Sequence, residues 1–234
     1  MTKSYRDAVS ETANSLLTGK SWIRVLEAGC GSASHLSLLP AAHTVGIDIS
    51  KEQLDRNAVV EEKIVGDIQE YPLPKEEFDV VVCWMVLEHV PRPKDALLNM
   101  FRATKMGGLV ILGIPNLLSI KGLATKLTPF WFHELFYRLM KYKSHPFPTY
   151  LRADIAPKRL VRFAEENGFT VELFRLVDGG QVERLRALYG FINAAMSVIG
   201  PVMRVITFGQ SPSWWLDNCF LVLKKQGPEP LKAT

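Results

Sequence analysis

The chain has 234 residues, of which 47% are hydrophobic and 22% charged, so it can build a core and is not expected to be disordered. Its 28 Lys and Arg exceed its 24 Asp and Glu by only four, which excludes the strong basic excess of a dedicated nucleic-acid-binding protein. Three scattered cysteines form no C-x-x-C pair, so neither a disulfide framework nor a zinc site is expected. A reducing, cytoplasmic setting fits this cysteine usage.

The first half of the chain predicts alternating strands and helices. Residues 1–17 are polar and amphipathic, which predicts a first helix rather than a secretory signal. Apolar runs predict strands at 21–29, 43–50, 63–67, 78–86 and 107–115. Segments of helical pattern lie between them, at 32–40, 51–59 and 93–105. This alternation predicts a doubly wound α/β fold, a mostly parallel sheet with helices on both faces.

After Pro115 the pattern changes. Two lipophilic segments, 116–156 and 178–213, interrupt the alternation and are predicted to form a lid over a substrate. A helix is predicted at 156–169, and strands at 169–177 and 215–225 complete a seven-stranded Rossmann-like sheet. We expect residues 1–234 to form a single domain with these two insertions.

The stretch VLEAGCGSASH, residues 25–35, predicts a ligand site after the first strand. Ligands of doubly wound sheets bind beyond the carboxyl ends of the strands, and Gly29 and Gly31 permit a tight turn there. Ser34 stands where a dinucleotide fingerprint has a third small residue, so that match is partial. Glu27 would repel a pyrophosphate and attract an ammonium group, which favours a nucleoside that carries an amino acid.

Two further acids follow the next strands. Asp48 ends VGIDIS, where its carboxylate can accept hydrogen bonds from both ribose hydroxyls. Asp67, in GDIQ, can accept from an exocyclic adenine amine while Ile68 packs against the ring. Either acid could instead cap the helix that follows it, a common role of Asp. The joint placement of three acids favours a cationic nucleoside.

The motifs EAGCG, VGIDIS, GDIQEYPLPKEEFDVVVCWMVLEHV and KMGGLVILGIPN, over about residues 20–115, resemble the class I S-adenosylmethionine-dependent methyltransferases, in particular the small-molecule and quinone branch. The resemblance implies S-adenosylmethionine as the cofactor. By the same resemblance, its methionine, ribose and adenine parts would be bound by Glu27, Gly29, Gly31, Asp48, Ile49, Asp67, Ile68, Trp84 and Met85.

Methyl transfer from a sulfonium requires alignment, desolvation and, for a weak nucleophile, a base. His89, just past the fourth strand, and His133, in the first insertion, are the candidate bases. The alternative for both is a packing role, and no metal is expected. The turn after the fourth strand lacks an N-P-P-Y motif, which argues against an adenine or glutamine nitrogen as the acceptor.

The insertions favour a hydrophobic or lipid-linked small-molecule acceptor, methylated at oxygen or carbon. Residues 117–160 hold eight cations and two acids, a net charge of +6, interleaved with aromatic residues as in segments that bind an anionic membrane surface. Residues 190–209 are about as long as a membrane span and contain one charge, Arg204. A lid helix with solvated cations is the alternative to a peripheral membrane surface.

Two other functions remain open at this level. An NAD-dependent oxidoreductase would also use Asp48 for a ribose, although Glu27 and Ser34 speak against it. A non-catalytic, methyltransferase-like scaffold at a membrane is the second alternative. The oligomeric state is not predicted by the sequence.

Overall fold

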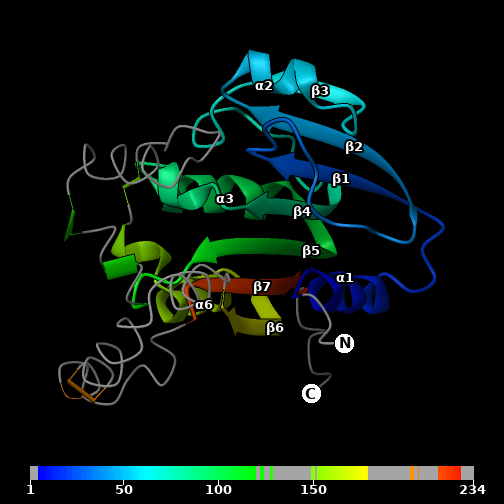
Figure 1. The fold of residues 1–234 in the computed structure, drawn as a ribbon. Coiled ribbons are helices and arrows are strands. Elements are labelled where there is room, and N and C mark those ends of the chain that lie inside the picture. Colours follow the sequence, from blue (N-terminus) through cyan, green and yellow to red (C-terminus); the bar gives the residue numbers. More distant parts are fainter. Residues whose placement is uncertain are drawn as a thin grey trace, which may run out of the picture.

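A single seven-stranded sheet organises the chain. The computed structural model describes residues 5–119, 122–123, 127–128, 149–150, 152–178, 201–202, 205 and 216–227. The strand order is β3-β2-β1-β4-β5-β7-β6, and β7 alone runs antiparallel to its neighbours (Figure 1). Strands β2 and β3 lie on one side of β1, and β4 and the later strands lie on the other side. A topological switch point therefore lies between β1 and β4.

All seven predicted strands are confirmed, with small changes at their ends. The strands are β1 (Trp22–Ala28), β2 (Ala41–Asp48), β3 (Glu62–Val65), β4 (Phe78–Trp84), β5 (Thr104–Pro115), β6 (Phe169–Val177) and β7 (Asn218–Lys225). β5 begins three residues earlier than predicted, because Thr104 already pairs with Phe78 of β4. Every residue of β4 is buried, as expected for a central strand of a covered parallel sheet.

Helices cover both faces of the sheet. They are α1 (Tyr5–Leu16), α2 (Lys51–Arg56), α3 (Pro93–Ala103) and α6 (Pro157–Glu166), with short 3-10 turns η1 (Leu87–His89) and η2 (Ala153–Ile155). Val9 and Ala13 of α1 pack with Val80 and Val82 of β4 on one face. On the other face α3 and α6 pack over the alternate residues of the same strands, including Val81. The doubly wound fold class is therefore confirmed.

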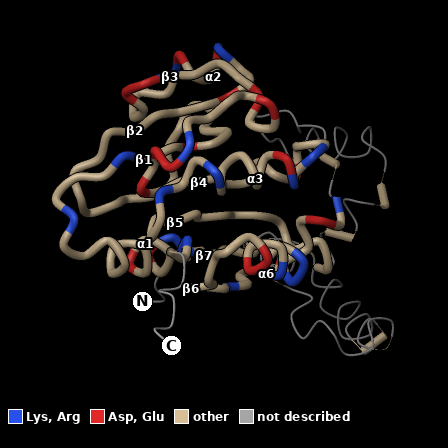
Figure 2. The backbone as a smooth tube through the Cα atoms, turned by 180° about the vertical axis from the view of Figure 1, so that it is seen from behind, with Lys and Arg blue, Asp and Glu red and all other residues tan. Residues whose placement is uncertain are grey.

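The central strand β5 carries few charged residues. Figure 2 shows both signs of charge distributed over the outer segments, while the long strand β5 is uncharged over most of its length. The buried run of β5 supplies Leu109, Val110, Ile111 and Leu112 to the two core clusters. The core is thus mainly apolar on both faces of the sheet.

The prediction of a helix at 32–40 is wrong. This segment forms an irregular connection in which Leu36 and Leu38 pack on the core cluster that includes α1, while Ser37 between them is exposed. Asn14 of α1 accepts the backbone N–H of Leu39 at 2.8 Å, so a tertiary contact satisfies part of this backbone. The serines of the segment favour such local alternatives to a helix.

Most residues of the two predicted lid insertions lie outside the described residues, so their lid role stays a prediction. None of the helices in the part of the chain that the structure describes combines the length and apolar character that a membrane crossing requires.

Candidate functional site

The glycine turn after β1 is the centre of the candidate site. The N–H of Gly29 donates to the carbonyl of Ile47 at 2.7 Å, which binds the turn to the end of β2. Gly29 and Gly31 have φ angles of 69° and 51°, in the region that favours glycine. A Cβ on Gly29 would lie 2.5 Å from Cγ2 of Val86, so no larger residue fits without displacing the chain after β4. The two glycines therefore allow a backbone path that other residues would disturb.

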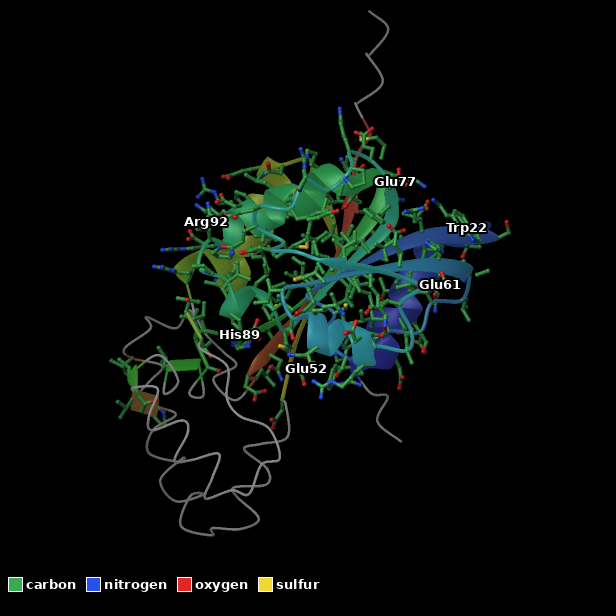
Figure 3. The ribbon with its side chains drawn as sticks, turned by 90° about the horizontal axis from the view of Figure 1, so that it is seen from above. Trp22, Glu52, Glu61, Glu77, His89 and Arg92 are labelled. Carbon is green, nitrogen blue, oxygen red and sulfur yellow. The ribbon has the colours of Figure 1, made fainter. Side chains whose placement is uncertain are left out.

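The acids predicted from the sequence lie at the carboxyl ends of neighbouring parallel strands. In the strand register Ala28, next to Glu27, pairs with Ile47, which precedes Asp48, and β3 ends opposite Asp48. Figure 3 shows His89 at the opposite end of the molecule from Trp22 and Glu61, which lie where β1 and β3 begin. Consequently the candidate residues gather at the carboxyl ends of the strands, where ligands bind in this architecture.

Asp48 links the glycine turn to α2. Its Oδ2 accepts the N–H of Gly31 and its Oδ1 accepts the N–H of Ser50, each at 2.8 Å. The helix cap is Ser50, whose hydroxyl accepts the N–H of Gln53. The alternative that Asp48 serves as the cap of α2 is therefore wrong. Two of the about four acceptor positions of its carboxylate are used by backbone groups, which leaves capacity for ligand hydroxyls.

Glu27 is a buried acid whose carboxylate accepts a hydrogen bond from one side chain, that of Ser34. Its side chain is 8% exposed, and its Oε2 accepts one hydrogen bond, from the hydroxyl of Ser34 at 2.8 Å. Burial raises the pKa of Glu27, and the Ser34 hydrogen bond opposes that rise. Among the described residues Glu27 has no ion-pair partner. A positively charged ligand group would therefore gain strongly from lying beside it.

Asp67 and the two isoleucines differ in exposure. The Asp67 carboxylate accepts from the backbone N–H and the side-chain amide of Gln69 at 2.8–2.9 Å. Ile68 is 5% exposed and packs in the core with residues of α3, and its contact with an adenine ring stays a prediction. Ile49, beside Asp48, is 75% exposed. Of these two isoleucine side chains, that of Ile49 is the exposed one.

Trp84 belongs to a stack of aromatic rings. It is 8% exposed, lies 4.6 Å from the ring of Phe220 and 5.9 Å from that of His35, and Phe220 stacks in turn on Tyr5. Trp84 is therefore mainly a core residue. Met85 follows with a positive φ of 54° and donates its N–H to Gly113 at 2.8 Å, a strained turn at the end of β4.

His35 stacks on Trp84, a contact that the sequence did not reveal. Burial, together with the charge of Arg6, lowers the pKa of His35 and favours its neutral form. The predicted helix at 32–40 hid its position, because helical geometry gives no reason to place this ring on Trp84. The serine-rich composition of the segment was the available signal against a helix.

Of the two predicted catalytic histidines, the structure describes one. His89 lies in η1 with a side chain about one third exposed, and its Nε2 is 4.0 Å from the carboxylate of Glu88. The backbone N–H of Tyr150 donates to the carbonyl of Glu88 at 2.8 Å, so residues far along the chain return to this turn. His133 lies outside the described residues. In the described ranges no His, Cys, Asp and Glu gather in a group that could hold a metal ion.

Comparisons with known proteins agree with this geometry. Residues 26–112 match the family model described as "Methyltransferase domain". The chain is 27% identical over 164 residues to a mitochondrial ubiquinone biosynthesis O-methyltransferase of Schizosaccharomyces pombe, covering 65% of this chain and 57% of that protein. It is 29% identical to the ubiquinone biosynthesis O-methyltransferase of Pseudomonas fluorescens, covering 67% of each. The chain spans less than half the length of several other curated relatives that it matches.

A solved structure shares the fold at low sequence identity. It is an S-adenosylmethionine-dependent methyltransferase from Mesorhizobium loti, with a TM-score of 0.53 and 14% identity over 94% of this chain and the whole of that one. Fold, glycine turn and family match define the class: residues 26–112 form a class I S-adenosylmethionine-dependent methyltransferase domain. The predicted family is thereby confirmed, and S-adenosylmethionine is the cofactor of this class.

Proposed function

We propose that the whole chain transfers a methyl group from S-adenosylmethionine to an apolar or lipid-linked small molecule, at oxygen or carbon. The observation that supports this proposal best is the group of acids around the glycine turn. Glu27 is buried and has no cationic partner among the residues that the structure describes, and Asp48 binds the turn while keeping free acceptor positions. A ligand with an ammonium group and a ribose satisfies both.

The described residues fit each part of the cofactor. Glu27 would bind the ammonium of the methionine moiety, and the glycine turn would let the backbone approach it. Asp48 would accept from the ribose hydroxyls, Ile49 would cover the adenine, and Asp67 would accept from its exocyclic amine. Trp84 supports this edge from the core. Ile68, which the sequence predicts to pack on the adenine, lies in the core next to this position.

Methyl transfer from a sulfonium requires mainly that the protein align the acceptor with the methyl group. When bound, the cofactor supplies an electrophilic methyl group on a positively charged sulfur. The chain would then orient the acceptor, exclude water and, for a hydroxyl, hold a base within reach. His89 at the end of β4 remains the described candidate for that base, and His133 remains a candidate from the sequence. The neutral imidazole of His35 is a third group at the same edge.

The acceptor class is inferred from the insertions and the relatives. The relatives named as ubiquinone biosynthesis O-methyltransferases match about two thirds of this chain. Residues 117–160 carry a net charge of +6 among many aromatic side chains, and residues 190–209 are almost uncharged. An apolar or lipid-linked acceptor at a peripheral membrane surface suits this composition.

Calorimetric titration of the purified chain with S-adenosylmethionine and, separately, with NAD tests the cofactor. We expect micromolar binding of S-adenosylmethionine alone. Binding of NAD alone would instead support the oxidoreductase. Binding of neither, in the presence and absence of anionic vesicles, would favour the non-catalytic scaffold.

Substitution of aromatic residues in the first insertion tests the acceptor. We expect Trp131→Ser with Phe132→Ser to lower methylation of a prenylated phenol while leaving the affinity for S-adenosylmethionine unchanged. Phe174→Ser, at an aromatic residue of β6 that is 41% exposed, is the matched control. Equal loss of both properties in the double variant would show a core role and contradict the lid.

A further inference from the structure

Gln69 holds the carboxylate of Asp67 from two directions. Its backbone N–H donates to Oδ1 at 2.9 Å. Its side-chain Nε2 lies 2.9 Å from Oδ1 and 2.8 Å from Oδ2, so the amide group bridges both oxygens. The two residues therefore form one unit at the end of β3, and Gln69 determines where the Asp67 carboxylate points.

The orientation of the Gln69 amide is itself fixed. Its Oε1 accepts the backbone N–H of Arg92 at 2.8 Å. Because a backbone N–H can only donate, the amide oxygen must face Arg92 and the NH₂ group must face Asp67. Arg92 is held in turn, since its guanidinium contacts Glu70 and Asp95. Figure 3 shows Arg92 on the same side of the molecule as His89, opposite Trp22.

Helix α3 forms hydrogen bonds to the backbone of the loop that carries Asp67. Asn99 donates from its side-chain amide to the carbonyl of Ile68 at 2.9 Å and to that of Tyr71 at 2.7 Å. Ile68 is buried in the core against this helix. The loop that carries Asp67 is thus fixed at both its side chains and its backbone, so its carboxylate is preorganised for a ligand.

The hydrogen bonds leave Asp67 with little free acceptor capacity. A carboxylate offers about four acceptor positions, two on each oxygen. Gln69 occupies both positions on Oδ1 and one on Oδ2. One position on Oδ2 remains, which matches a single N–H of an exocyclic amine. A carbonyl oxygen in place of that amine would face a carboxylate oxygen and be repelled.

We propose that Gln69 is a specificity-determining positioning residue that restricts Asp67 to one acceptor position and thereby selects a 6-aminopurine over a 6-oxopurine. The inference rests on the proposed function, because Asp67 must face the base of a bound nucleoside. Gln69 acts through Asp67 and touches no reacting atom.

Competition between two nucleosides tests the inference. The affinities of S-adenosylhomocysteine and S-inosylhomocysteine are measured by calorimetry for the parent chain and for Gln69→Met, which keeps the side-chain length but lacks the amide. We expect the parent to prefer the adenine form, and Gln69→Met to lose about tenfold in affinity for it, the size of one hydrogen bond to a charged group. The ratio of the two affinities should fall by a similar factor. Gln226→Met, the same change at the far end of β7, should leave both affinities unchanged.

The results of this competition test the role of Gln69 separately from the proposed binding of S-adenosylmethionine. Binding of the adenine form with a ratio that Gln69→Met leaves unchanged would overturn the inference and keep the proposed function. A parent chain that binds neither nucleoside would overturn both. If Gln69→Met does not fold, Gln69→Glu is the second variant, because it keeps the shape and replaces the donor by an acceptor. An unchanged ratio there would also overturn the inference.

Discussion

Two buried acids, Glu27 and Asp79, lie at opposite ends of the parallel strands and have opposite electrostatic environments. Glu27, at the carboxyl edge, is 8% exposed and accepts one hydrogen bond, from Ser34. Asp79, at the start of β4, is 5% exposed and accepts from Lys20, Lys105 and the N–H of Arg24 at 2.5–3.0 Å. Within the described ranges Glu27 pairs with no cation, whereas Asp79 pairs with two lysines.

The two pKa values follow from these partners. Burial raises the pKa of Glu27, and Ser34 offsets only part of that rise. Burial also acts to raise the pKa of Asp79, but the hydrogen bonds from Arg24, Lys105 and Lys20 outweigh it and lower the pKa to about 2. An acid that is compensated within the chain stabilises the fold, whereas an uncompensated one is available to a ligand. We therefore expect Asp79 to contribute mainly to stability and Glu27 mainly to ligand binding.

The largest expected effect concerns Asp48, the centre of the binding edge. We expect Asp48→Ala to weaken S-adenosylmethionine binding at least about 100-fold, since the ribose acceptor and the tie to Gly31 are lost together. The free energy of unfolding should fall by only about 1 kcal/mol, because the lost bonds lie in a partly exposed turn.

Calorimetry and urea denaturation check the Asp48 prediction. Ser50→Ala is the control, because it removes the cap of α2 and keeps the Asp48 carboxylate. We expect this variant to lose about 1 kcal/mol of stability and little affinity. Equal affinity of Asp48→Ala and the parent would contradict the placement of the ribose.

Glu27→Gln should weaken cofactor binding roughly 30-fold, about 2 kcal/mol, without loss of stability. The native pKa of Glu27 lies above its ordinary value of 4.5, so the parent loses stability as the pH rises from 4.5 through the native pKa. The variant lacks this loss and should be at least as stable as the parent at pH 7. Urea denaturation at pH 5 and pH 8 compares the two chains, and a marked loss of stability in the variant would contradict the assignment of Glu27 to binding.

Asp79→Asn is expected to show the reverse pattern. Its native pKa is depressed, so Asp79 stabilises the fold above its ordinary pKa of 3.8, and this contribution disappears as the pH falls through about 2. At pH 7 the variant should lose about 2 kcal/mol of unfolding free energy. The difference from the parent should shrink as the pH is lowered from 4 toward 2 in denaturation experiments. Weakened cofactor binding with unchanged stability would reverse the roles of the two edges.

The smallest effect is expected at Ser34. Ser34→Ala removes the hydrogen bond that lowers the pKa of Glu27, so less of this acid is ionised at a given pH. Binding of S-adenosylmethionine should weaken about threefold at pH 6, and less at pH 8, where ionisation is more complete. Calorimetry at both pH values measures the difference. A loss that is independent of pH would show that Ser34 acts by another route.

The strands could be predicted because their signal is local and strong. The apolar runs around Val80 and Leu109 are long, rich in β-branched residues and bounded by charged or turn-forming segments. The failed helix at 32–40 shows the limit of this reasoning. Its conformation depends on Asn14 and on the core beneath α1, which are distant in the sequence.

The candidate site was predictable as a set of residue types, and less so in its contacts. Glu27, Asp48 and Asp67 follow successive strands, and parallel strands bring their carboxyl ends to one edge. The difference in exposure between Ile68 and Ile49 was not predictable, because both are equally apolar in the sequence. Their exposures of 5% and 75% depend on the packing of α3.

The sequence by itself determined the order of strands and helices, the glycines that permit the turn, and the acids that end the strands. Only the tertiary structure decided which acid is compensated. Lys20 and Lys105 lie 59 and 26 residues from Asp79 along the chain, yet both donate to its carboxylate. The pKa of a carboxyl depends on its burial and on charges within a few ångströms. Such proximity arises only when the sheet is assembled, and the same assembly buries Glu27 where no described residue supplies it with a cation.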